Sequence, residues 1–233
     1  MSPLIADLDR FVRTRTAWHS IAEHVVSPAR YHTVGKIGLR AVAGGFGTPH
    51  FGDDRRVLIV GDEIVREQYG ASAVAPITTL RAAAEFVGIE PGAPTEVFMP
   101  TTPFELDRLL EIDPEDATRL AGWYALGAAV LGTWRELHRD GAPSLVQLWP
   151  EHFDLACDLG DADGGARANY GFSPGDDAIP EPYAYVGPWD IARHPSPAWD
   201  QSWGASLRNS QLGADAAGQI VEFFSVSEDA IRV

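Results

Sequence analysis

The chain has 233 residues, with 33 acidic and 18 basic side chains and a formal net charge of −15 at pH 7. No cluster of Lys and Arg offsets this charge, so the composition argues against nucleic acid as a partner. Hydrophobic residues make up 45% of the chain, which is enough for a substantial core. Because the composition does not shift sharply anywhere, we expect a single domain over residues 1–233.

The chain carries no feature that directs it out of the cytoplasm. Cys157 is the single cysteine, so no intramolecular disulfide can form, and no segment resembling a signal peptide opens the sequence. The uncharged stretch from Leu120 to Trp134 is shorter than the roughly 20 apolar residues that span a bilayer. We therefore expect a cytoplasmic protein without membrane contact.

The first half begins with a helix and continues with strands. Apolar residues from Leu4 to Val25 recur at helical spacing, which predicts an amphipathic helix that stops before Pro28. Alternation over residues 34–41 predicts a strand with one wet face. The glycine-rich stretch from Gly44 to Gly52 predicts a loop, and Arg56 to Val60 predicts a second strand.

Three helices are predicted next by their capping residues. Thr78 or Thr79 is suited to cap a short helix that runs through Val87, with Gly88 as its left-handed end. Thr102-Pro103-Phe104-Glu105 has the form of a capping box with proline at the first helical position.

The third helix starts at Asp113-Pro114-Glu115-Asp116, where acidic residues meet the positive helix end. Its apolar positions are those of a central core helix, and it contains Gly122, Gly127 and Gly132, where another backbone can approach.

The second half is strand-rich and ends in a helix. Strands are predicted at Ser144 to Leu148, Phe153 to Cys157, Ala166 to Phe172, Pro182 to Val186 and Ser202 to Arg208, and a helix at Ala214 to Phe224. This order predicts an α+β fold with an antiparallel or mixed sheet, or sheets, and helices packed on one side. A faint recurrence of strands, a Gly-Asp turn and an Ala-rich helix would suit two similar halves.

The sequence does not fit the common motifs of serine hydrolases and metal sites. Gly171 to Gly175 matches the G-x-S-x-G pattern, but the residue after the serine is Pro174, which has no N–H for an oxyanion hole. We interpret this stretch as a tight turn. His152 and Asp154 alternate on a predicted strand, yet no regular ligand spacing accompanies them. His19 and His24 are expected to splay apart on their helix. We predict neither a metal site nor a cofactor.

Aromatic residues are dense from Trp149 onward. Tyr183 and Tyr185 alternate on one predicted strand and therefore share a face. With Trp149 and the His152/Asp154 pair they would line a pocket, or they form a core layer whose hydroxyls reach water or backbone.

Four motifs occur in an order that resembles a bacterial family of unknown function. They are Val34-Gly35-Lys36-Ile37-Gly38-Leu39, Trp149 with Phe153-Asp154-Leu155-Ala156, Gly171-Phe172-Ser173-Pro174-Gly175, and Pro180-Glu181-Pro182-Tyr183-Ala184-Tyr185. The resemblance implies which residues belong to a site, but it implies no activity for them. It points to Lys36, Asp154, Glu181, Tyr183 and Tyr185.

Three functional hypotheses follow. The leading one is a pocket for a small molecule, lined by Lys36, Trp149, His152, Asp154, Glu181, Tyr183 and Tyr185. The second is a metal-assisted or acid/base enzyme that uses His152, Asp154 and Glu181. The third is an interaction module without a pocket, in which exposed aromatic residues dock a partner. The oligomeric state is left open.

Overall fold

The computed structural model describes residue 5 and residues 7–232. The chain divides into two compact units, the first made of Ile5–Ala125 and Leu148–Phe153, the second described over Leu126–Gln147 and residues 154–232. The described residues form two five-stranded antiparallel sheets with helices packed beside them, so the predicted α+β class is confirmed. Helix α4 (Pro114–Leu137) runs from one unit into the other, and a single domain over residues 1–233 stays a prediction.

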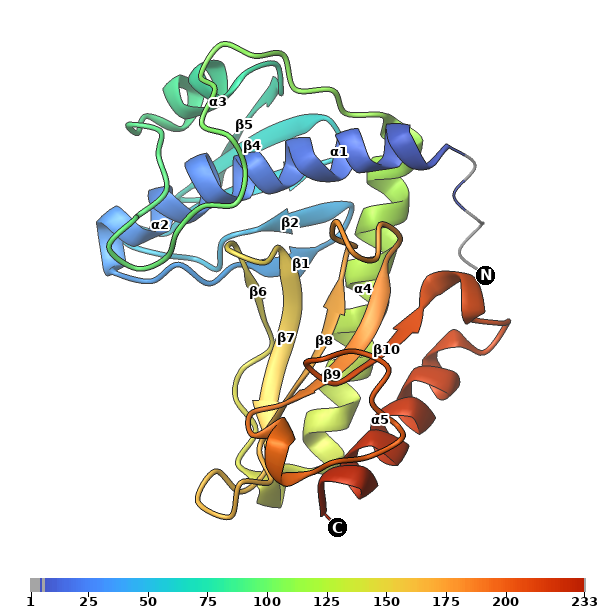
Figure 1. Ribbon diagram of the computed structural model, residues 1–233. Helices are drawn as coiled ribbons and strands as arrows, with labels where there is room; N and C mark the ends of the chain where they lie inside the picture. Colours follow the sequence, from blue (N-terminus) through green and yellow to red (C-terminus); the bar gives the residue numbers. More distant parts are fainter. Residues whose placement is uncertain (1–4, 6, 233) are drawn as a thin grey trace. The chain divides into compact units, whose positions relative to one another are not determined.

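The sheet of the first unit is a simple meander in the order β1-β2-β3-β4-β5 (Figure 1). Its strands are β1 (Arg40–Val42), β2 (Gly45–Gly47), β3 (Arg55–Val60), β4 (Glu63–Gln68) and β5 (Ala71–Pro76). The sequence predicted β3, but it placed β1 too early, at residues 34–41, and missed β4 and β5. The loop predicted from Gly44 to Gly52 is partly wrong, because β2 lies within it. Strands β4 and β5 are rich in charged and small residues and lack a clean alternation.

The first helix does not stop before Pro28, so that prediction was wrong. Helix α1 (Leu8–Ile21) passes through a π-helical turn, η1 (Ala22–Val26), into α2 (Ser27–Val34). Pro28 has no N–H to give to the His24 carbonyl four residues earlier, and that carbonyl accepts from Gly92 N at 2.9 Å instead. The wider π turn keeps the helix continuous past the proline. Leu4, expected to open this helix, lies outside the described residues.

Helix α1 lies across one face of the first sheet. The Trp18 ring packs edge-on against Phe46 of β2 at 5.4 Å, and its indole N–H donates to the Gly61 carbonyl at 2.9 Å. Helix α3 (Leu80–Val87) is capped by Thr79 and ends at the left-handed Gly88, as predicted. These contacts bury one face of the sheet under α1 and α3.

Residues 88–113, all of which the structure describes, contain no helix or strand. The helix predicted from the Thr102-Pro103-Phe104-Glu105 pattern is therefore wrong. Instead of capping a helix, the Thr101 and Thr102 donors bind a carboxylate of η1. We call residues 88–113 the connecting segment.

The second sheet has the order β10-β9-β8-β7-β6. Its strands are β6 (Gln147–Trp149), β7 (Asp154–Leu159), β8 (Ala168–Ser173), β9 (Tyr183–Pro188) and β10 (Ala205–Arg208), each within a few residues of its prediction. Short 3-10 turns lie at η2 (Arg139–Gly141), η3 (Ile191–Arg193) and η4 (Asn209–Gln211). The G-x-S-x-G stretch is not a turn as a whole, because Gly171 to Ser173 are the last residues of β8. Only Pro174 and Gly175 follow the strand, and Gly175 N donates to Ser173 Oγ at 3.1 Å.

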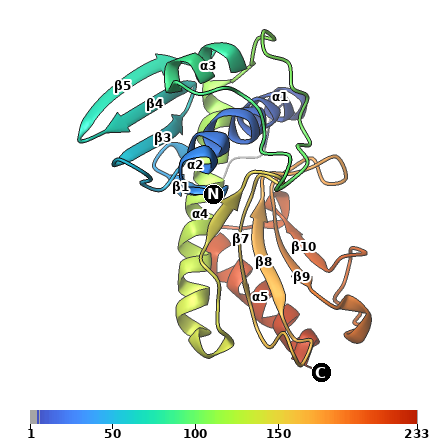
Figure 2. The same cartoon turned by 90° about the vertical axis from the view of Figure 1, so that its left-hand side faces the viewer.

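Within the second unit, α4 and α5 (Ala216–Arg232) lie on the same face of the sheet (Figure 2). Trp134 of α4 contacts Tyr170 of β8 and Phe224 of α5 at ring distances of 5.4 and 5.5 Å. Gly127 permits this packing, because a Cβ there would lie 2.8 Å from the Phe172 ring. Among the described helices, none combines the length and apolarity needed to cross a membrane.

Candidate functional site

Asp154, Tyr183 and Tyr185 lie on the sheet face opposite α4 and α5. Tyr185 pairs with Gly171, which alternates with Phe172 of the helix-covered face. The Tyr185 hydroxyl donates to the Asp154 carboxylate, and its ring covers Gly171, where a Cβ would lie 2.4 Å from the ring. The two tyrosines therefore share a face, as the sequence predicted.

The tyrosine hydroxyls are already engaged by carboxylates. Tyr183 donates to Asp176, and its ring stacks on Trp203 at 6.2 Å. Burial, followed by the Asp154 charge and hydrogen bond, raises the pKa of Tyr185 well above 10. Such groups act as packed hydrogen-bond donors and do not ionise near neutral pH.

The remaining predicted residues either make other contacts or belong to the first unit. Glu181 accepts from Ser210 N and Oγ, both at 2.9 Å, and so holds the η4 turn. Lys36, Trp149 and His152 belong to the first unit. Lys36 is exposed after α2, and Trp149 is half-buried at the end of β6.

His152 does not alternate with Asp154 on a strand. It lies exposed in a turn that ends at Phe153, whose φ is 53°, and β7 begins only at Asp154. The prediction that His152 and Asp154 alternate along one strand is therefore wrong. Within residue 5 and residues 7–232, no three His, Cys, Asp or Glu side chains group as metal ligands.

A buried carboxylate that sequence reasoning missed organises the first unit. Glu23 in η1 has no exposed surface. It accepts from the backbone N–H groups of Thr101 and Thr102 at 2.8 and 2.9 Å, and both threonine hydroxyls donate to it as well. Four donors thus converge on one side chain of the helix.

Two histidines flank this carboxylate. His19 Nε2 lies 3.5 Å and His24 Nε2 lies 3.9 Å from a Glu23 oxygen, so the two rings do not splay apart as expected. The π turn shifts the angular spacing of η1, which brings His24 to the side of the helix that faces His19 and Glu23. His19 also hydrogen-bonds the Pro150 carbonyl at 2.8 Å and stacks on Phe153.

The surroundings keep Glu23 ionised. Burial by itself would raise its pKa, but the hydrogen bond and charge of His19 and the donors of Thr102 and Thr101 outweigh burial and lower the pKa to about 2. Burial is the main cause that lowers the pKa of His24. The cluster is therefore a fixed negative anchor at neutral pH.

Glu23 is one of several points where the connecting segment is attached to the first helix. Gly92 N donates to the His24 carbonyl at 2.9 Å, and Asp113 N donates to Thr14 Oγ1 at 3.0 Å. On its other side the segment donates from Leu110 N to the Thr78 carbonyl at 2.9 Å. These bonds hold an irregular chain in a defined position.

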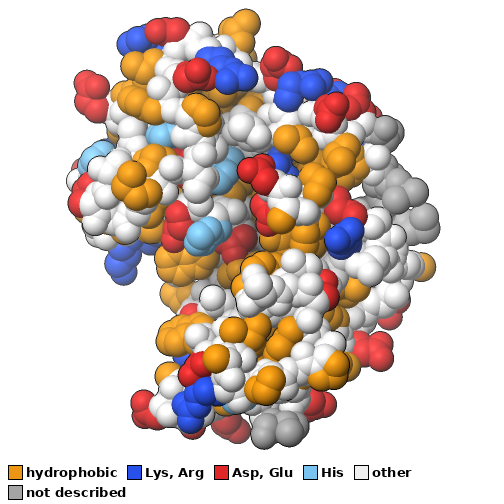
Figure 3. All heavy atoms as spheres, viewed as in Figure 1, with side chains coloured by type: hydrophobic (Ala, Val, Ile, Leu, Met, Phe, Trp, Pro, Cys, Tyr) orange, Lys and Arg blue, Asp and Glu red, His pale blue; other side chains and the backbone are white. Residues whose placement is uncertain are grey.

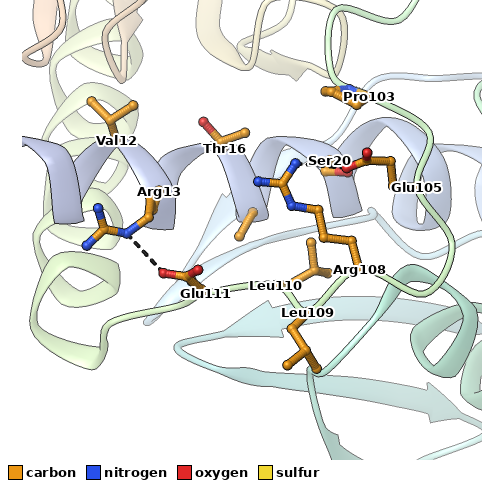
Figure 4. A pocket seen from close by; sticks show the side chains of 11 residues that line it. Val12, Arg13, Thr16, Ser20, Pro103, Glu105, Arg108, Leu109, Leu110 and Glu111 are labelled. Carbon is orange, nitrogen blue, oxygen red and sulfur yellow. Dashed lines mark hydrogen bonds and ion pairs between the residues drawn. The ribbon is translucent and has the colours of Figure 1, made fainter.

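A pocket of about 210 Å³ lies between α1 and the connecting segment (Figure 4). Helix α1 contributes Val12, Arg13, Thr16, Ala17 and Ser20. The connecting segment contributes Pro103, Glu105, Arg108, Leu109, Leu110 and Glu111.

The pocket combines apolar and charged groups. Arg13 Nε pairs with Glu111 at 3.0 Å, and Arg108 Nη1 pairs with Glu105 at 2.8 Å. Figure 4 shows Arg108 reaching from the segment towards α1. In Figure 3, acidic, basic and apolar side chains are interspersed on the surface over α1. Pro103 follows Thr102 directly, so the Glu23 cluster fixes one wall of the pocket.

Comparison with known proteins adds no relative. No family model, curated protein or solved structure matches the chain. The local geometry of each unit is therefore the basis for a functional argument.

Proposed function

We propose that the chain binds a small molecule in the pocket between α1 and the connecting segment. Ligand sites are typically concave, largely apolar and equipped with a few polar groups that orient the ligand. Ala17 and Leu110 supply apolar surface here, and the Arg13–Glu111 and Arg108–Glu105 pairs supply charge. At about 210 Å³ the pocket is smaller than the roughly 300–1,000 Å³ of typical ligand sites, which limits the ligand to a small metabolite.

The observation that carries this proposal is the attachment of the pocket wall to Glu23. A loop of this length without secondary structure is uncommon in a compact protein and is often a binding loop. An untethered loop would lose conformational entropy on binding a ligand, which weakens affinity. Because the Thr101 and Thr102 donors hold this wall in place beforehand, little of that cost remains.

The cluster of Asp154, Tyr183 and Tyr185 supports the same class of function less well. Its two hydroxyls donate to carboxylates of the second unit, which is what packed tyrosines require. In the acid/base alternative, both carboxylates already accept hydrogen bonds, Asp154 from the Tyr185 hydroxyl and Glu181 from Ser210 N and Oγ.

Thermal-shift screening of a metabolite panel tests the proposal. We expect at least one compound to raise the melting temperature of the full chain. Thr16→Trp places a large ring at the pocket, because Thr16 is an exposed lining residue, and it should abolish the shift. Thr118→Trp, at an exposed helical threonine of the same unit, should leave the shift intact. A panel without any stabilising compound, or binding that survives Thr16→Trp, would refute the proposal.

A further inference from the structure

The charged lining of the pocket is balanced in sign. It contains Arg13 and Arg108 together with Glu105 and Glu111, and therefore has no net charge, whereas the whole chain carries −15. A polyanion would be repelled by the field of the protein, and a simple cation would meet both guanidinium groups. Balanced charge instead suits a ligand that carries one charge of each sign.

The two ion pairs lie at different positions along α1. Arg13 pairs with Glu111 near one end of the pocket, while the Arg108 side chain points towards the part of α1 that carries Thr16 and Ser20 (Figure 4). From residue 13 to residue 18, midway between Thr16 and Ser20, an α-helix rises about 8 Å, at roughly 1.5 Å per residue. Residues of an extended chain advance about 3.3–3.6 Å each, so two or three of them span this distance.

The ion pairs themselves are easily rearranged. The side chains of Arg13 and Glu111 are 51% and 71% exposed, and those of Arg108 and Glu105 are 69% and 52% exposed. Exposed pairs of this kind contribute little to stability, and a guanidinium has five N–H donors, more than one glutamate uses. Each pair can therefore accept a charged ligand group without loss of the fold.

Building on the proposed function, we infer that the ligand is a free dipeptide or tripeptide with an apolar side chain. Its terminal carboxylate binds the arginine of one pair, and its terminal ammonium binds the glutamate of the other. The apolar side chain lies against Ala17 and Leu110, between the two pairs. The hydroxyls of Thr16 and Ser20 are available to the peptide backbone.

Calorimetric titration of the full chain with Ala-Leu-Ala tests this inference. The peptide with free termini should bind, and its N-acetylated and C-amidated forms should each bind at least about tenfold more weakly, as expected for loss of a charge-assisted contact. One of the two variants Arg13→Gln and Arg108→Gln should weaken binding of the free peptide about tenfold and leave binding of the C-amidated peptide unchanged. That variant identifies the arginine that binds the carboxylate. Arg139→Gln, at a side chain 74% exposed in the second unit, is the matched control.

Three outcomes overturn the inference, and the first two can be told apart. If a panel compound gives a shift that Thr16→Trp abolishes, but the free peptide does not bind or binds no better than its capped forms, the ligand class is wrong and the pocket stands. If neither the panel nor the peptide binds, the pocket itself is not a binding site. Equal effects of both arginine variants on free and capped peptides would also contradict the proposed contacts.

Discussion

Replacement of Glu23 by Gln should weaken the first unit in a manner that depends on pH. The substitution keeps the size of the side chain but removes its charge and one acceptor, and it turns an NH₂ group towards the donors of either Thr101 or Thr102. The pKa of Glu23 falls from 4.5 to about 2 in the folded protein. A tenfold change in acid constant equals about 1.4 kcal/mol, so the ionised carboxylate contributes about 3 kcal/mol at pH 7.

The sign of the pH dependence follows from the lowered pKa. A carboxylate whose folded pKa lies below its unfolded value stabilises the protein fully above pH 4.5, and the contribution is lost as the pH falls towards 2. The stability difference between wild type and Glu23→Gln should therefore be about 3 kcal/mol at pH 7 and should shrink steadily below pH 4.5. Glu90→Gln, at an exposed position of the same connecting segment, should have little effect at either pH.

Urea unfolding of the three proteins at pH 7, 4 and 3 measures these differences. Hydrogen exchange of the Thr101 and Thr102 amides is a second readout, because both N–H groups lose their charged acceptor. A stability difference below about 1 kcal/mol at pH 7 would show that the carboxylate is not the anchor we describe. A difference that stays constant down to pH 3 would contradict the assigned pKa.

Other substitutions test the packing of the second unit. Gly127→Ala should destabilise by about 1–3 kcal/mol in urea unfolding, because its Cβ would meet the Phe172 ring; Gly132→Ala, in the same helix with open space around it, should stabilise by up to about 1 kcal/mol. Tyr185→Phe should cost about 1–3 kcal/mol at pH 7, because Asp154 loses a donor. In an absorbance titration, Tyr185 should ionise only well above pH 10. The wild type and Tyr185→Phe should therefore form the same amount of tyrosinate between pH 10 and 11.

The elements that sequence reasoning predicted correctly are those whose signals are local. Helix α3 carries its own cap at Thr79 and its own left-handed end at Gly88. The Asp113-Pro114 start of α4 is equally local, since Asp113 Oδ1 accepts from Glu115 N and Asp116 N at 3.0 and 3.1 Å. Such motifs need no distant partner, and the same holds for the strands of the second half.

The errors arise where a local signal is used by a distant group. Thr102 has the hydroxyl and backbone N–H of a helix cap, yet both donors bind Glu23, which lies 79 residues earlier in the chain. Pro28 marks a helix end by local rules, yet the His24 carbonyl that it leaves without a donor is satisfied by Gly92. In both cases a hydrogen bond to a distant residue replaces the local one. Both distant hydrogen bonds attach the connecting segment to η1.

The candidate pocket was missed for the same physical reason. Its walls are one face of α1 and an irregular segment that carries no motif, and only the fold brings Arg13 close to Glu111. A sequence search for dense aromatic residues finds the Tyr185 layer, whose hydroxyls are engaged by carboxylates. The buried Glu23 would have been the better indicator, because an ionised carboxylate without exposed surface requires several donors, and those donors locate the wall of the pocket.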